Sequence, residues 1–436
     1  MKKIYSITFG FLSFVMILSL NSCQDKTYEE VTYTAKVPII MGFEEFRGAV
    51  KSTVPKQLHQ PGKIYFKDNY IFLNEFMEGI HIIDNADPSN PQIVNFLQIP
   101  GNTDMAVKGN ILLVNSSIDL VAIDISDPQN PQEVDRVENA FPNVLPALDD
   151  WSMPIYGLDF TKGVVVGWEE RQVTEVIERE NSPLFGRVMD DANGVPSIGQ
   201  NEVSFNSGSG IGGSMARFTL SGDHLYALHN SNLVMFNISG NQISPASEVS
   251  LNREAETLFP YGNNLFIGTT SGMLIYDISS PLFPTFISAF EHITACDPVV
   301  IQGNYAYVTL RSGTTCMNTA NQLDVVDISS LAHPFLVKSY PMYNPHGLGI
   351  DENVLFICDG DAGLKVFDAT DPMHIHQNQI AYFPDINTYD VIPMDGLLIM
   401  TGAQGLYQYD YTNLDSMQLI SVIPIIPLAP TGESGK

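Results

Sequence analysis

The sequence predicts an all-β protein whose main body is a closed β-propeller of about eight four-stranded antiparallel blades, with seven blades as the alternative. Three observations predict this fold. A short string that ends in Asp recurs at intervals near 40 residues, a hairpin pattern precedes each copy, and no useful helical periodicity follows the apolar N-terminus. Four-stranded units of this length are typical of propeller blades, which bury both faces of each small sheet against their neighbours.

The first 22 residues have the layout of a lipoprotein signal peptide. A basic start (Met1 to Lys3) precedes an uncharged, mostly apolar run from Ile4 to Leu20, and Asn21 and Ser22 lead to Cys23. Cys23 is therefore the expected lipid-bearing residue. A short transmembrane anchor is the alternative, but the apolar run is marginal for spanning a bilayer. We expect an outer-membrane lipoprotein that faces either the periplasm or the cell surface, attached to the membrane only through its lipid.

Residues 23–61 are expected to be a tether and an N-terminal segment, with a short helix between Val37 and Val50. The propeller is expected over residues 62–424. Inside it, a Gly-, Ser- and Asn-rich insertion is predicted at about residues 178–214. Residues 425–436 carry Pro, Gly and Ser and are predicted to be a disordered tail.

The repeated string is an apolar strand with a closing acidic or amide residue. Its copies are Gly79–Asp84, Asp119–Asp124, Asn232–Asn237, Gly272–Asp277, Gln322–Asp327, Gly363–Asp368 and Gly405–Asp410. Ser or Thr and a Pro-rich turn follow several copies. We expect the carboxylate to accept backbone N–H groups in an Asx-type turn, so the repeated Asp is architectural rather than catalytic.

The hairpins that precede these strings place a Gly, Asn or Asp turn between apolar runs. Their centres lie near Asp68, Gly109, Lys162, Gly222, Gly262, Gly303, Glu352 and Asp395. The third unit is the weakest, with a hairpin over Leu158–Trp168 and a poor third strand over Val173–Ile177. If residues 155–205 form an excursion instead, the propeller has seven blades.

The string Leu323-Asp324-Val325-Val326-Asp327-Ile328-Ser329 resembles the LVIVD repeat family. The resemblance extends over roughly residues 62–424 and implies a propeller-like bacterial lipoprotein. It implies no activity.

Charge excludes one class of partner. The net charge is −28 and the chain has only 21 Lys and Arg residues, whereas nucleic-acid binding needs a clustered basic surface. A glycan or a protein ligand remains open, and no cofactor or metal site is expected. Motifs for nucleophilic, zinc or phosphate chemistry are missing, so no catalytic residue is predicted.

One end of the central channel is the expected binding site, because the entrances of the inner strands and the loops between second and third strands meet there. The entrances carry Lys63, Asp104, Tyr156, Arg217, Glu256, Asp297, His346 and Asp390. The loops carry Glu75, Glu169, Arg171, His229, Arg311, Asp359 and Asp361. We select Asp104, Arg311, His346, Asp359 and Asp361 as candidate binding residues. A water-filled polar funnel without a ligand is the alternative.

Two functions compete on this basis. The first is a non-catalytic surface module that binds a glycan or a protein. The second is an extracytoplasmic hydrolase or lyase with paired carboxylates and His346 in the funnel.

Three cysteines remain once Cys23 is lipidated. Cys296 enters the inner strand of one predicted blade, and Cys316 lies in the second-to-third loop of the same blade. We expect these two to form a disulfide, which an extracytoplasmic location permits. Cys358 ends an apolar strand and is expected to be a small buried hydrophobe.

Overall fold

The computed structural model describes residues 28–148, 150, 152–178, 211–214, 216–291, 298–312 and 321–426. These fall into two compact units, which we describe separately. The smaller comprises the described residues of Met1–Pro38, Leu148–Leu158 and Trp168–Gly194. The larger comprises those of Ile39–Ala147, Asp159–Gly167 and Val195–Lys436.

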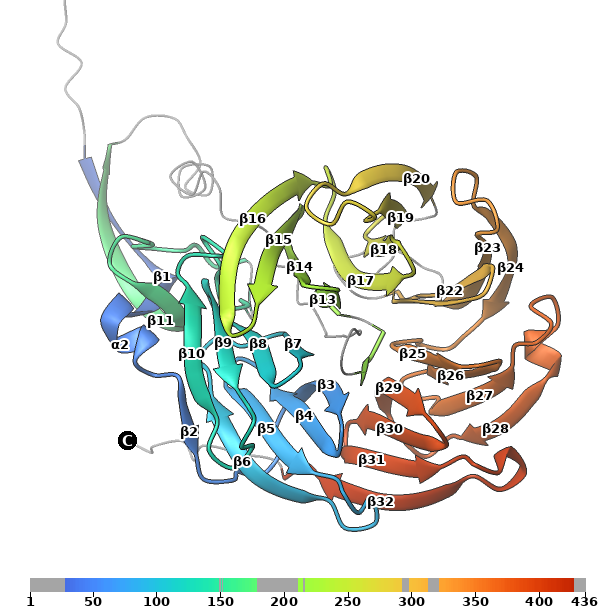
Figure 1. The fold of residues 1–436 in the computed structure, drawn as a ribbon. Helices are drawn as coiled ribbons and strands as arrows, with labels where there is room; N and C mark the ends of the chain where they lie inside the picture. Colours follow the sequence, from blue (N-terminus) through green and yellow to red (C-terminus); the bar gives the residue numbers. More distant parts are fainter. Residues whose placement is uncertain are drawn as a thin grey trace, which may run out of the picture. The chain divides into compact units, whose positions relative to one another are not determined.

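The larger unit is a β-propeller of seven four-stranded antiparallel blades, arranged around a central axis (Figure 1). The first three blades are β3 to β6 (Pro61–Lys67, Tyr70–Glu75, Gly79–Asp84, Gln92–Gln98), β7 to β10 (Met105–Lys108, Ile111–Ser116, Asp119–Asp124, Gln132–Val137) and β13 to β16 (Phe218–Ser221, His224–His229, Asn232–Ser239, Gln242–Ser250).

The fourth and fifth blades are β17 to β20 (Ala255–Tyr261, Asn264–Thr269, Gly272–Asp277, Thr285–Glu291) and β21 to β24 (Val299–Gln302, Tyr305–Leu310, Gln322–Asp327, Phe335–Pro341). The last two are β25 to β28 (Leu348–Asp351, Val354–Cys358, Leu364–Asp368, Gln379–Phe383) and β29 to β32 (Thr388–Met394, Leu397–Gly402, Gly405–Asp410, Gln418–Pro424). Two 3-10 turns, Ile375–Gln377 and Leu414–Ser416, precede the outer strands of blades 6 and 7.

The expected hairpins are present in all seven blades. The turn between first and second strands has a left-handed residue in every case, with φ between 46° and 60° at Asp68, Gly109, Gly222, Gly262, Gly303, Glu352 and Asp395. The apolar side chains of these strands fill the spaces between neighbouring blades. One buried cluster joins blades 3 and 4, another blades 4 and 5, and others blades 5 and 6 and blades 6 and 7.

The repeated Asp has the structural role that the sequence predicts. Its Oδ1 accepts the backbone N–H two residues later, as in Asp124 with Ser126 (2.8 Å), Asp277 with Ser279 (2.7 Å) and Asp410 with Thr412 (2.8 Å). Hydrogen bonds from Ser279 hold the pKa of Asp277 below its usual range. In all seven blades the ladder between the third and fourth strands also shifts register one or two residues before this position, as at Ile275/Tyr276 and Val325/Val326. Such bulges increase local twist.

The preferred count of eight blades is wrong, and the alternative of seven is confirmed. The predicted third blade is not a blade, because Val164–Glu178 forms one strand, β11, that pairs only with β1 (Tyr28–Met41). No hairpin turns at Lys162; Asp159 accepts the backbone N–H of Thr161 there instead, at 3.0 Å. Trp168–Glu178 contains five charged residues, with three in succession at Glu169–Arg171, so it lacks the continuous apolar run of the second and third strands of the blades.

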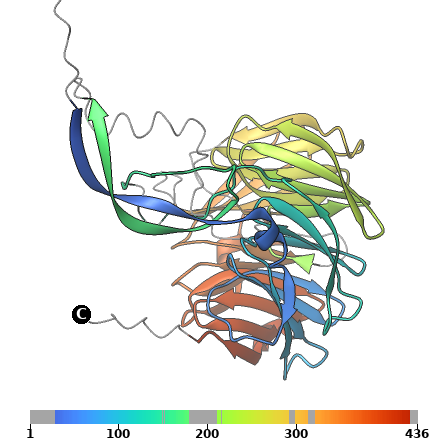
Figure 2. The ribbon, with the colours of Figure 1, turned by 90° about the vertical axis from the view of Figure 1, so that its left-hand side faces the viewer.

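Part of the predicted tether and N-terminal segment (residues 23–61) forms the strand β1. β1 and β11 run side by side as a long twisted ribbon (Figure 2). Within the smaller unit, the Tyr33 hydroxyl donates to Glu175 at 2.7 Å, and Lys36 pairs with Glu170 at 3.0 Å. Burial and the Glu175 contact raise the pKa of Tyr33 to about 12.

The expected short helix is present as α2 (Phe43–Arg47), and a three-residue strand, β2 (Lys51–Thr53), then adds to the outer edge of blade 1. Buried Asp119 accepts from Arg47 and Arg136, both at 2.9 Å, and so fixes the helix to blade 2. Among the described residues, no helix is long and apolar enough to cross a membrane.

Candidate functional site

Six of the seven blades place a polar residue at the entrance of the innermost strand. They are Lys63, Asp104, Arg217, Glu256, His346 and Asp390, from blades 1, 2, 3, 4, 6 and 7 respectively. Asp297, expected in blade 5, lies outside the described residues. Tyr156 belongs to the smaller unit and is not part of this ring.

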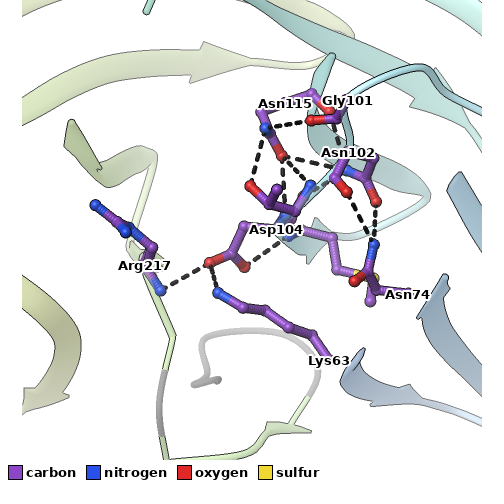
Figure 3. A network of polar contacts seen from close by, with 9 residues as sticks. Lys63, Asn74, Gly101, Asn102, Asp104, Asn115 and Arg217 are labelled. Atoms are coloured by element: carbon purple, nitrogen blue, oxygen red, sulfur yellow. Dashed lines mark hydrogen bonds and ion pairs between the residues drawn. The ribbon is translucent and has the colours of Figure 1, made fainter. Parts of the chain in front are cut away.

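Lys63 and Asp104 form a buried ion pair, with exposed side-chain fractions of 2% and 1% (Figure 3). Asp104 also accepts the backbone N–H of Arg217 at 2.8 Å and of Met105 at 2.7 Å. Burial lowers the pKa of Lys63 and raises the pKa of Asp104, and their mutual attraction opposes both shifts. Since its oxygens are buried and engaged, Asp104 is not available to a ligand in this structure.

A chain of amides fixes the loop that carries Asp104. Asn74 donates to Asn102 at 2.7 Å, and Asn102 donates to the backbone oxygen of Asn115 at 2.9 Å. Asn115 in turn accepts the backbone N–H of Asp104 at 2.8 Å (Figure 3). This network joins blades 1 and 2 and is structural.

A segment of the chain lies across the channel at this level. We call residues 211–214 and 216–217 the channel segment. Its first two residues, β12 (Ile211–Gly212), pair with β3, and Ser214 Oγ accepts from Leu348 N of blade 6 at 2.9 Å. Ala216 O accepts from Leu258 N of blade 4 at 2.6 Å. With the Arg217–Asp104 bond, the segment contacts the inner strands or their entrances in blades 1, 2, 4 and 6. It therefore touches Asp104 directly and pairs with β3, the strand that carries Lys63.

Arg217 is the next charged group along the ring. It is partly buried, and burial lowers the pKa of its guanidinium although Glu256, Asp104 and Glu254 attract its charge. Burial also raises the pKa of Glu254. Burial, and secondly the charge of Arg217, lower the pKa of His229, the predicted loop residue of blade 3.

Arg311 and His346, predicted from two different blades, are brought into contact. Arg311 Nη1 lies 3.1 Å from Nδ1 and 3.3 Å from Nε2 of the His346 imidazole. Asn344 Nδ2 lies 3.3 Å from Nε2 of the same ring. Arginine has no acceptor, so its guanidinium donates in this contact. Tyr343, 63% exposed, precedes Asn344. We call Arg311, Tyr343, Asn344 and His346 the rim cluster.

Asp359 holds the backbone of the rim cluster through hydrogen bonds. It is fully buried and accepts the backbone N–H groups of Tyr343 (3.0 Å) and Asn344 (2.8 Å), and it forms an ion pair with Lys365. Its role is therefore to position the Tyr343–Asn344 turn. Asp361, two residues later, is exposed.

The other predicted loop residues are dispersed. Glu75 is buried and pairs with buried His81 at 2.8 Å, and the hydrogen bonds that it accepts lower its pKa in spite of its burial. Glu169 and Arg171 form an ion pair within the smaller unit. These residues do not join the rim cluster.

Sequence reasoning missed Tyr343, Asn344 and Ser214. Tyr343-Asn344 lies between Pro341 and Pro345, immediately before His346, so an aromatic and an amide in a proline-flanked connection was the available signal. For Ser214 no local signal existed, because its contacts come from distant blades.

Of the four cysteines, Cys358 is the one that lies among the described residues. Cys358 is fully buried, and burial raises the pKa of its thiol, as expected of a small core residue. Cys23, Cys296 and Cys316 lie outside the described residues.

Comparison with known proteins supports the repeat assignment. A family model described as LVIVD repeat matches residues 101–139 and 294–341, which contain the strands of blades 2 and 5. The chain therefore carries LVIVD repeats in these two regions, and the resemblance seen in the sequence is confirmed there. No curated protein matches the chain.

Solved bacterial propellers are similar in fold. The periplasmic gluconolactonase PpgL of Pseudomonas aeruginosa is 10% identical, with a TM-score of 0.51 over 84% of this chain and 97% of that one. BamB of Moraxella catarrhalis is 11% identical, with a TM-score of 0.45 over 85% and 90%.

PorZ of Porphyromonas gingivalis, a bacterial surface component of the type-IX secretion system, is 11% identical with a TM-score of 0.46. The match covers 87% of this chain but only 39% of PorZ. At these identities the similarity concerns the fold alone.

Proposed function

We propose that this protein is a lipid-anchored propeller of the bacterial envelope that binds a neutral saccharide through the rim cluster and does not catalyse a reaction. The observation that carries the proposal is the assembly of an exposed tyrosine, an amide, a guanidinium and an imidazole at one end of the channel. Predicted residues from blades 5 and 6 meet there.

The chemistry of the cluster suits a sugar. The apolar face of a pyranose packs on an aromatic ring, and Tyr343 offers such a ring with 63% of its surface exposed. Hydroxyl groups both donate and accept, and the Asn344 amide and the Arg311 guanidinium, which both contact the His346 ring, present planar sets of polar atoms next to Tyr343 in the chain or in the same cluster. A few well-placed polar groups beside an apolar surface are typical of small-ligand sites.

The cluster is also held in place before any ligand arrives. Asp359 fixes the backbone of Tyr343 and Asn344, and Asn321 accepts from Ser312 N at 2.7 Å while donating to Tyr343 O. Thr309 Oγ1 donates to the backbone oxygen of His346 at 2.7 Å. Preorganisation of this kind lowers the entropy that binding costs.

A neutral saccharide is favoured over an acidic polymer because the chain carries a net charge of −28. Binding is favoured over hydrolysis because the two buried carboxylates selected as candidates, Asp104 and Asp359, are occupied by lysines and backbone N–H groups. A general acid or base has to reach the substrate.

A glycan array probed with the full-length protein in detergent tests this function. We expect selective binding to neutral glycans, a roughly tenfold loss in Tyr343→Ala, and unchanged binding in Tyr382→Ala. Tyr382 is the matched control, because it is 45% exposed on the outer strand of the same blade. If no glycan on the array binds, and a protein partner instead binds the surface around Tyr343, the saccharide proposal is wrong.

The anchor and the disulfide are part of the same proposal. We expect Cys23 to bear the lipid and to hold the protein at the outer membrane, so Cys23→Ser should abolish palmitate labelling and membrane association. Persistence of both in the mutant would contradict the assignment. Cys296 and Cys316 are proposed to pair; recovery of their separate, alkylatable peptides from native protein would refute that pairing.

A further inference from the structure

Asp390 holds the channel segment from blade 7. The backbone N–H of Ser214 donates to its carboxyl group, and Ser214 Oγ lies 3.5 Å from Oδ1. Gly347 packs against the same carboxyl so closely that an added Cβ would lie 2.1 Å from Oδ1. The closed segment and the Asp390 carboxyl therefore share one tightly packed contact.

The surroundings of the Asp390 carboxyl would stabilise its ionised form poorly. Asp390 is 2% exposed, and its Oδ2 has no hydrogen-bond partner in the part of the chain that the structure describes. The groups that face it are Lys63 from β3, which is already paired with Asp104, and the Cys358 thiol from β26. Val391 and Ser214 contribute backbone N–H groups. A buried charge with this little compensation is costly.

We propose that the channel segment is a reversible gate, and that the protonated side chain of Asp390 keeps it closed. Opening would carry Ser214 away from Asp390 and expose Asp390, Lys63 and Asp104 to water from the channel mouth. This inference concerns the channel and does not depend on the saccharide site.

The direction of the pH effect follows from linkage. Burial raises the pKa of Asp390 to about 8 in the closed state, whereas a hydrated aspartate has its ordinary value near 3.8. The closed state therefore binds a proton that the open state releases over this range. Closure is most stable below about pH 4 and is weakened progressively as the pH rises towards 8, by up to about tenfold per pH unit in the open-to-closed ratio.

Hydrogen–deuterium exchange of the full-length protein between pH 5 and 8 tests the gate. After correction for the intrinsic pH dependence of exchange, protection of amides held by the gate should fall as the pH rises. The reporters are the N–H groups of Leu348, Leu258 and Arg217, which donate to the channel segment or are part of it. Amides of β8 (Ile111–Ser116) should keep constant protection, because this strand is paired with β7 on one side and with β9 on the other.

Asp390→Asn keeps the shape of the neutral acid and removes its titration, so protection at the reporter amides should become independent of pH. Asp351→Asn is the matched control for the loss of one carboxylate, because Asp351 ends β25 whereas the reporter Leu348 begins it. In this variant the pH dependence of amide protection should be that of the wild type. Wild-type protection that does not change with pH, or a slope that survives in Asp390→Asn while the β8 amides remain protected, would overturn the gate.

Discussion

Asp359 and Asp361 are two residues apart and have opposite surroundings. Asp359 is fully buried, with two backbone donors and Lys365 around it, whereas Asp361 is exposed. The sequence places both in one loop between second and third strands and does not distinguish them, since burial there depends on the turn of Tyr343 and Asn344, which precedes β25.

Asp359→Ala should lower the free energy of unfolding by about 3 kcal/mol, because it leaves Lys365 and two N–H groups without their acceptor. Asp361→Ala should change it by less than about 0.5 kcal/mol. Urea unfolding of the two variants measures the difference. Equal stability of both would mean that Asp359 does not support the rim cluster as described.

The blade is the element that recurs, and one glycine shows why its third strand starts as it does. Gly272 begins β19 with φ 144°, and a Cβ there would lie 2.2 Å from the carbonyl oxygen of Phe290 on the outer strand. The glycine therefore permits the close approach of the third and fourth strands. Its recurrence in several copies of the repeated string was visible in the sequence, although its reason was not.

Gly272→Ala should destabilise the protein by about 3 kcal/mol, since the outer strand would have to move. Gly262→Ala is the control: its φ is 60° and nothing lies within 4 Å of the added Cβ, so the cost should stay near 1 kcal/mol. Thermal and urea unfolding compare the two. A smaller loss at Gly272 than at Gly262 would show that the strand approach is not rigid.

The elements that the sequence predicted well are those with local signals. Turn residues, the closing Asp and the apolar strand patterns were sufficient to predict the seven blades, because each of these signals depends on residues that are close together in the sequence. β11 was misassigned for the opposite reason. Its valines fit a blade strand equally well, and only β1, more than 100 residues earlier, decides its partner.

At the scale of the whole molecule, blades 1 and 7 have to meet to close the ring. Each consists of four consecutive strands, so no strand is exchanged between them. Asn85 and Gln408 instead exchange two amide hydrogen bonds of 2.8 Å, and Ile426 N donates to Leu58 O at 2.9 Å. Residues 425 and 426, the first two of the predicted tail, pair with Leu58.

Gln408→Ala should lower the free energy of unfolding by about 2 kcal/mol, because the buried Asn85 amide then lacks both of its partners. Gln132→Ala, an exposed glutamine at the start of β10, should have little effect. Hydrogen exchange of the β3 and β29 amides would show whether the loss of stability is confined to blades 1 and 7, where the ring closes. A uniform loss across all blades would contradict a localised role.

The candidate site could be predicted in part. Arg311 and His346 were selected because repeat register places second-to-third loops and inner-strand entrances at one end of the channel, and they do touch. Asp104 was selected by the same rule, yet Lys63 and the Arg217 N–H of the channel segment engage its carboxylate. That segment comes from the long insertion, for which the repeat gives no register.

Photo-crosslinking in the native envelope tests whether the rim cluster binds a saccharide. Benzoylphenylalanine replaces Tyr343 in one strain and Tyr382 in a control strain, and intact mass spectrometry of the protein follows irradiation. We expect a carbohydrate adduct at position 343 and none at position 382. The absence of any adduct at 343, or equal adducts at the two positions, would contradict ligand binding at the rim cluster.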